Sequence, residues 1–150
     1  MKTIAEILAD HKFFEGLTPQ HLELIAGCGE NMRFDAGDYL FRESEPSDLF
    51  FVLRYGAVAV EVSDPRKGRI SIQTVTEGEV LGWSWLFEPY LWHYDARAMT
   101  LIRAIAIHGD CLRGKCESDH DFGYEMMKRF AGIMVQRLQA TRLQVLDVYG

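Results

Sequence analysis

The residues best suited to chemistry lie in one stretch, residues 78–97, which reads GEVLGWSWLFEPYLWHYDAR. It contains three Trp, two Tyr and one Phe, interrupted by Pro89, and it separates two segments with strand-like patterns. A simple β-turn needs none of these rings. An aromatic loop of this length either lines a ligand pocket or fills one with its own side chains. The sequence alone leaves both interpretations open.

The other polar clusters do not predict catalysis or a metal site. Asp10 with His11, and the run 119–121 (Asp-His-Asp), are sequence neighbours in cap or loop contexts rather than spatial triads. The acidic run 117–121 does not have the ligand spacing of a divalent-metal loop. No Gly-rich phosphate loop of the nucleotide-hydrolase type is present. We therefore expect neither an enzyme nor a metal protein.

Composition and charge indicate one cytoplasmic domain. The chain has 150 residues, 48% of them hydrophobic, and a net charge of −6, which disfavours general attraction to DNA or anionic lipid. No apolar run approaches the ~20 residues of a membrane span, and acidic residues stand where a signal peptide has its apolar run. Cys28, Cys111 and Cys116 match neither a zinc Cys-x-x-Cys pair nor an even disulfide set. We expect free thiols in a reducing compartment.

The chain divides into N-terminal helices (1–30), a β region (31–108) and C-terminal helices (109–150). Thr3 with Glu6, and Thr18 before Pro19, are helix-start signals. From Met32 the apolar period is two, in short segments separated by turn residues. This predicts a mainly β protein with flanking helices, built on an eight-stranded jelly-roll β-barrel (double-stranded β-helix). The predicted strands are 32–34, 39–41, 49–54, 57–62, 69–75, 79–81, 96–99 and 102–107.

A short helix over 110–116 precedes a long one, capped by Ser118 or Asp119, that continues to about Val148 and is ~45 Å long. One apolar stripe of this helix has coiled-coil spacing, which predicts a homodimer through residues 131–148. Its members are Ala131, Met134, Leu138, Thr141, Val145 and Val148. A second stripe, Met126, Phe130 and Ile133, is expected to face the barrel. The alternative is a helix that packs only within the monomer.

Five segments resemble the cyclic nucleotide-binding domain family. Residues 34–41 (FDAGDYLF), 48–53 (DLFFVL) and 56–60 (GAVAV) are similar to its N-terminal strands, and 78–82 (GEVLG) to the start of its phosphate-binding cassette. Residues 136–141 (QRLQAT) resemble the long helix of the bacterial catabolite-activator and fumarate-nitrate-regulator branch. The resemblance implies a signal-transducing sensor domain, here without a helix-turn-helix, and so no nucleic acid bound by this chain alone.

The resemblance also implies a ligand, cyclic AMP or cyclic GMP, and the residues that would bind it. Glu79 would accept hydrogen bonds from a ribose hydroxyl, backbone N–H groups at Gly82–Ser84 would face a cyclic phosphate, and Thr141 would reach the purine. The implied ligand-binding set is Gly78, Glu79, Leu81, Gly82, Trp83, Ser84, Trp92, His93, Arg97 and Thr141.

The chain departs from the family pattern where the phosphate would lie. Trp92 occupies the position of the family's cassette arginine, and His93 that of the following Ser or Thr. Without the arginine, little offsets the desolvation of a buried phosphate, and a solvated or dimer-facing charge is the favoured interpretation of Arg97. An aromatic pocket with His93 would suit haem, but a single His bonded to a backbone carbonyl is the more frequent case.

Three functions remain open on this basis. The first is a sensor domain that binds a small ligand and shifts its long helix. The second is a degenerate, self-filled domain that serves as a dimerisation or protein-interaction module. The third is the sensor part of a transcription regulator.

Overall fold

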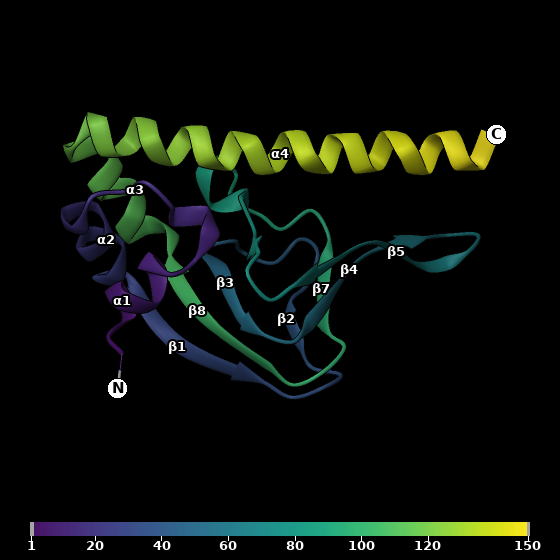
Figure 1. The fold of residues 1–150 in the computed structure, drawn as a ribbon. Coiled ribbons are helices and arrows are strands. Elements are labelled where there is room, and N and C mark those ends of the chain that lie inside the picture. Colours follow the sequence, from purple (N-terminus) through teal and green to yellow (C-terminus); the bar gives the residue numbers. More distant parts are fainter. Residues whose placement is uncertain (1, 150) are drawn as a thin grey trace.

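The computed structural model describes residues 2–149, with side chains described for residues 2–143. Two four-stranded antiparallel sheets, with strand orders β1-β8-β3-β6 and β2-β7-β4-β5, form the predicted jelly roll (Figure 1). The strands are β1 (Gly29–Phe34), β2 (Tyr39–Phe41), β3 (Leu49–Tyr55), β4 (Ala57–Asp64), β5 (Gly68–Thr76), β6 (Val80–Leu81), β7 (Asp95–Ala98) and β8 (Ile102–His108). Each of the eight predicted strands overlaps one of these, so the fold prediction is confirmed.

Three helices begin at the positions that their predicted cap residues indicate. Thr3 accepts a hydrogen bond from the Glu6 amide, Thr18 from the His21 amide, and Asp119 from the Phe122 amide. These three side chains satisfy amides that a helix start leaves unpaired. The helices are α1 (Ile4–Ala9), η1 (Lys12–Phe14), α2 (Pro19–Ala26), η2 (Ser84–Leu86), α3 (Gly109–Ser118) and α4 (His120–Tyr149).

The long helix α4 crosses the whole molecule. Its N-terminal half packs on the helical end of the domain, and its C-terminal half extends to the side of the β4–β5 hairpin (Figure 1). Met126 and Phe130 are fully buried, and Phe130 meets the rings of Phe50 and Trp85 edge-on. Ile133 is half-buried against the same core. The stripe predicted to face the barrel therefore does so.

The other stripe of α4 is largely exposed. Leu138 is 66% exposed, and Ala131 and Thr141 are also exposed. Met134 differs from the prediction because it is partly buried and packs against the core of its own domain. Val145 and Val148 lie outside the described side chains. No helix in the described chain is long and apolar enough to cross a membrane.

The prediction of three free thiols is wrong, because Cys28 and Cys111 form a disulfide. Cys28 directly precedes β1 and Cys111 closely follows β8, and the antiparallel pairing of these strands sets Gly29 opposite Ile107. The two cysteines thus meet across 83 residues of sequence. Spacing rules for neighbouring cysteines cannot detect such a pair. Cys116 remains a half-buried free thiol.

The thiol count tests this pairing. In unreduced, denatured protein we expect one thiol to react with Ellman's reagent, and three after reduction. In the native protein, burial and then the nearby Glu117 and Asp119 carboxylates raise the pKa of Cys116 to about 11. Because the thiolate is the reactive form, Cys116 should react slowly at neutral pH and faster as the pH rises toward that value. Three reactive thiols before reduction would contradict the disulfide.

Candidate ligand-binding site

The cassette begins with a close contact between backbone and ring. Leu81 is buried in β6, and Gly82 follows with φ +105°, a conformation that favours glycine. A Cβ atom at Gly82 would lie 2.8 Å from the ring of Trp92. Glycine is therefore required twice at this position, for its backbone conformation and for the space that the Trp92 ring takes.

Trp92 fills the position at which the family pattern has an arginine. Its side chain is 4% exposed, and its ring stacks on Phe41 with centroids 3.5 Å apart and an interplanar angle of 6°. Both rings belong to the apolar cluster between the two sheets. The Trp92 backbone is also fixed, since its amide donates to Glu45 and its carbonyl accepts from Ser44. An apolar ring therefore occupies the position that the resemblance assigns to the cassette arginine.

Tyr94 and Arg137 lie beside this filled position. Nη1 of Arg137, from α4, donates to the Tyr94 hydroxyl at 2.7 Å, and its guanidinium lies 4.7 Å from the centroid of the Trp83 ring. Tyr94 is 5% exposed; burial raises the pKa of its hydroxyl, and Arg137 opposes that shift. The sequence interpretation assigned Arg137 no role. Helical spacing could have identified it, because Arg137 follows the barrel-facing Ile133 by four residues and so lies on the same face of the helix.

Glu79 lies at the turn between β5 and β6 and is exposed. Its Oε1 accepts hydrogen bonds from both the amide and the hydroxyl of Thr76, each at 2.9 Å. The preceding Gly78 has φ +88° and belongs to the same turn. In this structure the Glu79 carboxylate therefore holds the turn.

The remaining predicted site residues are dispersed. His93 is exposed, while Ser84 is buried with no hydrogen-bond partner for its hydroxyl among the described residues. The hydroxyl of Thr141, which is exposed, donates to the Arg137 carbonyl at 2.9 Å. Arg97 points to β4, where Nε and Nη2 contact the two carboxylate oxygens of Glu61 at 3.1 Å each. The structure thus brings together Leu81, Gly82, Trp83 and Trp92, and separates them from Arg97.

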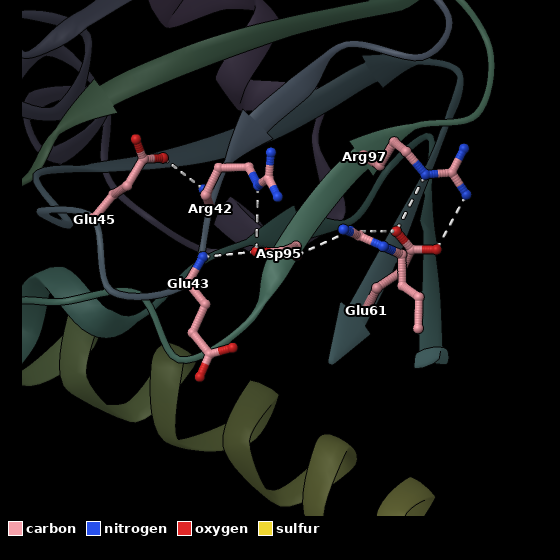
Figure 2. Close-up of polar contacts among 7 residues, drawn as sticks. Arg42, Glu43, Glu45, Glu61, Asp95 and Arg97 are labelled. Atoms are coloured by element: carbon pink, nitrogen blue, oxygen red, sulfur yellow. Dashed lines mark hydrogen bonds and ion pairs between the residues drawn. The ribbon is translucent and has the colours of Figure 1, made fainter. Parts of the chain in front are cut away.

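Arg97 belongs to an ion network across the second sheet (Figure 2). Arg69 lies between the buried carboxylates, 3.5 Å from Glu61 and 2.9 Å from Asp95. Arg42 contacts Asp95 at 3.7 Å, and the Glu43 amide donates to it at 2.7 Å. The Arg97 hydrogen bond lowers the pKa of Glu61. The carboxylates of Glu61 and Asp95 therefore engage all three arginines.

Comparison with known proteins gives one consistent family. A profile described as "Cyclic nucleotide-binding domain" matches residues 31–119. A "CRP-like cAMP-activated global transcriptional regulator" of Mycobacterium tuberculosis is 24% identical over 95% of this chain. That alignment covers 62% of the relative, so the chain spans less than two thirds of its length.

Solved structures agree. A protein of Geobacter metallireducens GS-15 assigned to the cyclic nucleotide-binding proteins has a TM-score of 0.80 at 28% identity and covers 92% of this chain and 99% of its own. A cyclic nucleotide-binding domain from Methylobacillus flagellatus has a TM-score of 0.81 at 18% identity, with coverage of 97% and 82%, and this likeness bears on the fold alone.

Proposed function

The chain belongs to the cyclic nucleotide-binding domain family, and on that premise we propose that it is a non-enzymatic regulatory domain whose in-barrel nucleotide position is filled by its own side chains. The observation that carries this proposal is the Trp92 ring, buried on Phe41 and in contact with Gly82. A cyclic phosphate there would have to displace a packed ring and would find no cation in its place. The domain then acts through α4 rather than through a nucleotide in the barrel.

Titration with cyclic nucleotides tests the filled barrel. We expect neither cyclic AMP nor cyclic GMP to shift the thermal melt of the wild-type domain. A ligand at about 100 times its dissociation constant would add about 2.7 kcal/mol of stability, which is readily seen. A saturable shift with either nucleotide would contradict the proposal. In that case the domain is a nucleotide sensor, and Ser84 and Thr141 are the residues to substitute next.

The output surface of this proposal is the exposed apolar stripe of α4. Its exposed large side chains are Leu138 and, one heptad before Ala131 and Met134, Tyr124 and Met127, with Val135 at its edge. An apolar stripe of this length on one helix is suited to pairing with the same stripe of a second copy. We propose that two copies associate through α4 in an antiparallel or parallel pair around a two-fold axis.

A charge on this stripe tests the dimer. Leu138→Glu should weaken dimerisation by at least about tenfold, because a carboxylate at the centre of an apolar interface is buried without a partner. Light scattering with size-exclusion chromatography measures the mass over a dilution series. Gln139→Glu, an exposed neighbour outside the stripe, adds the same charge and should leave the mass unchanged. A wild-type protein that is monomeric throughout would contradict this part of the proposal.

The transcription-regulator alternative rests on the mycobacterial relative. Under this alternative, a DNA-binding region would follow the same domain. The barrel would still be filled by its own side chains, and α4 would still be the output surface. Fusion to such a region would make α4 the link between the two parts.

A further inference from the structure

A groove of about 410 Å³ lies outside the barrel, between α4, η1 and the β5–β6 turn. Three cationic side chains line it, Lys12 from η1 and Arg129 and Arg137 from α4. The volume falls within the range of small-molecule sites in proteins. The ligand-binding set that the resemblance implies includes Gly78 and Glu79 of this lining, but none of its three cations.

The charges in the groove are unbalanced. Lys12 and Arg137 form no ion pair with a carboxylate among the described residues. Arg129 forms one, a long contact of 3.8 Å with Glu125. Glu79 is the one acidic side chain in the lining, and its Oε1 is already bound by Thr76. Three cations thus face one carboxylate in a protein whose net charge is −6.

Both arginines are held in place but not saturated. Arg129 donates to the Phe13 carbonyl at 2.7 Å, and Arg137 donates to Tyr94. Arg137 Nη2 also donates to the Val80 carbonyl, at the long distance of 3.4 Å. A guanidinium that is fixed in position and retains donors is well suited to an oxyanion, since little side-chain entropy remains to be lost on binding.

The rest of the lining suits an organic body rather than a bare ion. Gln73 and Gln136 offer amide groups, and Phe13 and Ile133 offer apolar surface. Gly132 leaves space, because a Cβ atom added to it would meet nothing within 4 Å. We infer that this groove binds a small organic phosphate, with the phosphate on Lys12, Arg129 and Arg137.

The groove is a different cavity from the filled barrel, and Arg137 links the two. Arg137 contributes to the groove lining and also contacts Tyr94 and Trp83 at the barrel. A phosphate bound to Arg137 would therefore act directly on the helix that carries the exposed apolar stripe. The inference goes beyond the proposed function and does not require it, since it concerns another cavity.

Direct titration of the intact chain tests this inference. Pyrophosphate and AMP serve as probes, with adenosine as the uncharged comparison, in low-salt buffer. We expect the two phosphates to bind and adenosine not to, and we expect the affinity to fall as salt is added. In amide NMR spectra, the resonances of Gly78 and Gly132 should move while that of Gly82 stays in place, because only the first two line the groove.

Two variants make the test specific to the groove. Gly132→Leu fills the open space without changing charge, and should weaken AMP binding on the order of tenfold or more while favouring the helix. Lys12→Gln removes an exposed cation and should weaken pyrophosphate binding about two- to fivefold. The matched controls are Gly114→Leu, on α3 with the same open surroundings, and Lys67→Gln in the β4–β5 turn, and both should bind as the wild type does.

The possible results separate this inference from the proposed function. If neither phosphate binds at millimolar concentrations, or if Gly132→Leu binds as tightly as Gly114→Leu, the groove inference is overturned. If a second copy of the chain occupies the groove, Gly132→Leu will lower the mass of the assembly instead, which also overturns it. Movement of Gly82 with a cyclic nucleotide would instead overturn the filled barrel and leave the groove result standing.

Discussion

Replacing Trp92 with alanine should lower the free energy of unfolding by about 3–5 kcal/mol, the usual cost of truncating a large buried ring. Trp92 is buried between the sheets, stacked on Phe41 and packed against Gly82, so its removal leaves a cavity lined by rigid neighbours. Partial collapse of the site would place the loss at the lower end of that range. The melting temperature should fall by roughly 10 °C, measured by calorimetry or by denaturant unfolding.

Phe87→Ala is the matched control in the same loop. Phe87 is 57% exposed, so its loss should cost no more than about 0.5 kcal/mol. If the two variants lose equal stability, or if Trp92→Ala is as stable as the wild type, the Trp92 ring does not fill the barrel. The proposed function would then lose its main support. A stable Trp92→Ala domain that binds cyclic AMP when the wild type does not would, by contrast, support the displacement of ligand by the ring.

The features that the sequence predicted well are those specified locally. Each strand carries its own alternation and turn residues, and the cap residues Thr3, Thr18 and Asp119 act within four positions of their own helix start. The barrel-facing stripe of α4 follows from helical spacing alone. These signals need no knowledge of the partner element, so they can be interpreted from one chain.

The features that the sequence did not predict depend on which distant elements become neighbours. Cys28 meets Cys111 only because β1 pairs with β8. Arg97 was interpreted as a solvated or dimer-facing charge, but the pairing of β7 with β4 places it beside Glu61. The aromatic loop could equally have lined or filled a pocket, and the direction of the Trp92 ring depends on Phe41, about fifty residues earlier. The residue types and their spacing along the sequence do not determine any of these contacts.

The second large effect is expected at the Arg97–Glu61 pair. Arg97→Met should lower the free energy of unfolding at neutral pH, because it leaves the buried Glu61 carboxylate with Arg69 alone. The loss should be smaller than that of breaking a fully buried pair, since the Arg97 side chain is 37% exposed and screened by solvent. Arg103→Met, on the exposed side of β8, removes the same charge and should cost much less.

The pH dependence of this loss follows from the direction of the Glu61 pKa shift. Arg97 holds the pKa of Glu61 below its ordinary value of 4.5 in the folded state. A depressed carboxyl pKa contributes stability that is fully present above the unfolded-state pKa and is lost as the pH falls through the folded-state pKa. The gap between the wild type and Arg97→Met should therefore be constant near neutral pH and close below about pH 4.5.

A double-mutant cycle separates this pair from the rest of the network. Glu61→Gln removes the charge and retains the shape, so Arg97→Met should cost less in that background than in the wild type. A coupling that is present at pH 7 and shrinks as the pH is lowered below 4.5 would show that Arg97 acts as the counter-ion of Glu61. Equal costs in both backgrounds would mean that Arg97 contributes by packing alone. Its guanidinium would then not be committed to Glu61, and Arg97 would again be a candidate cation for a ligand in the barrel.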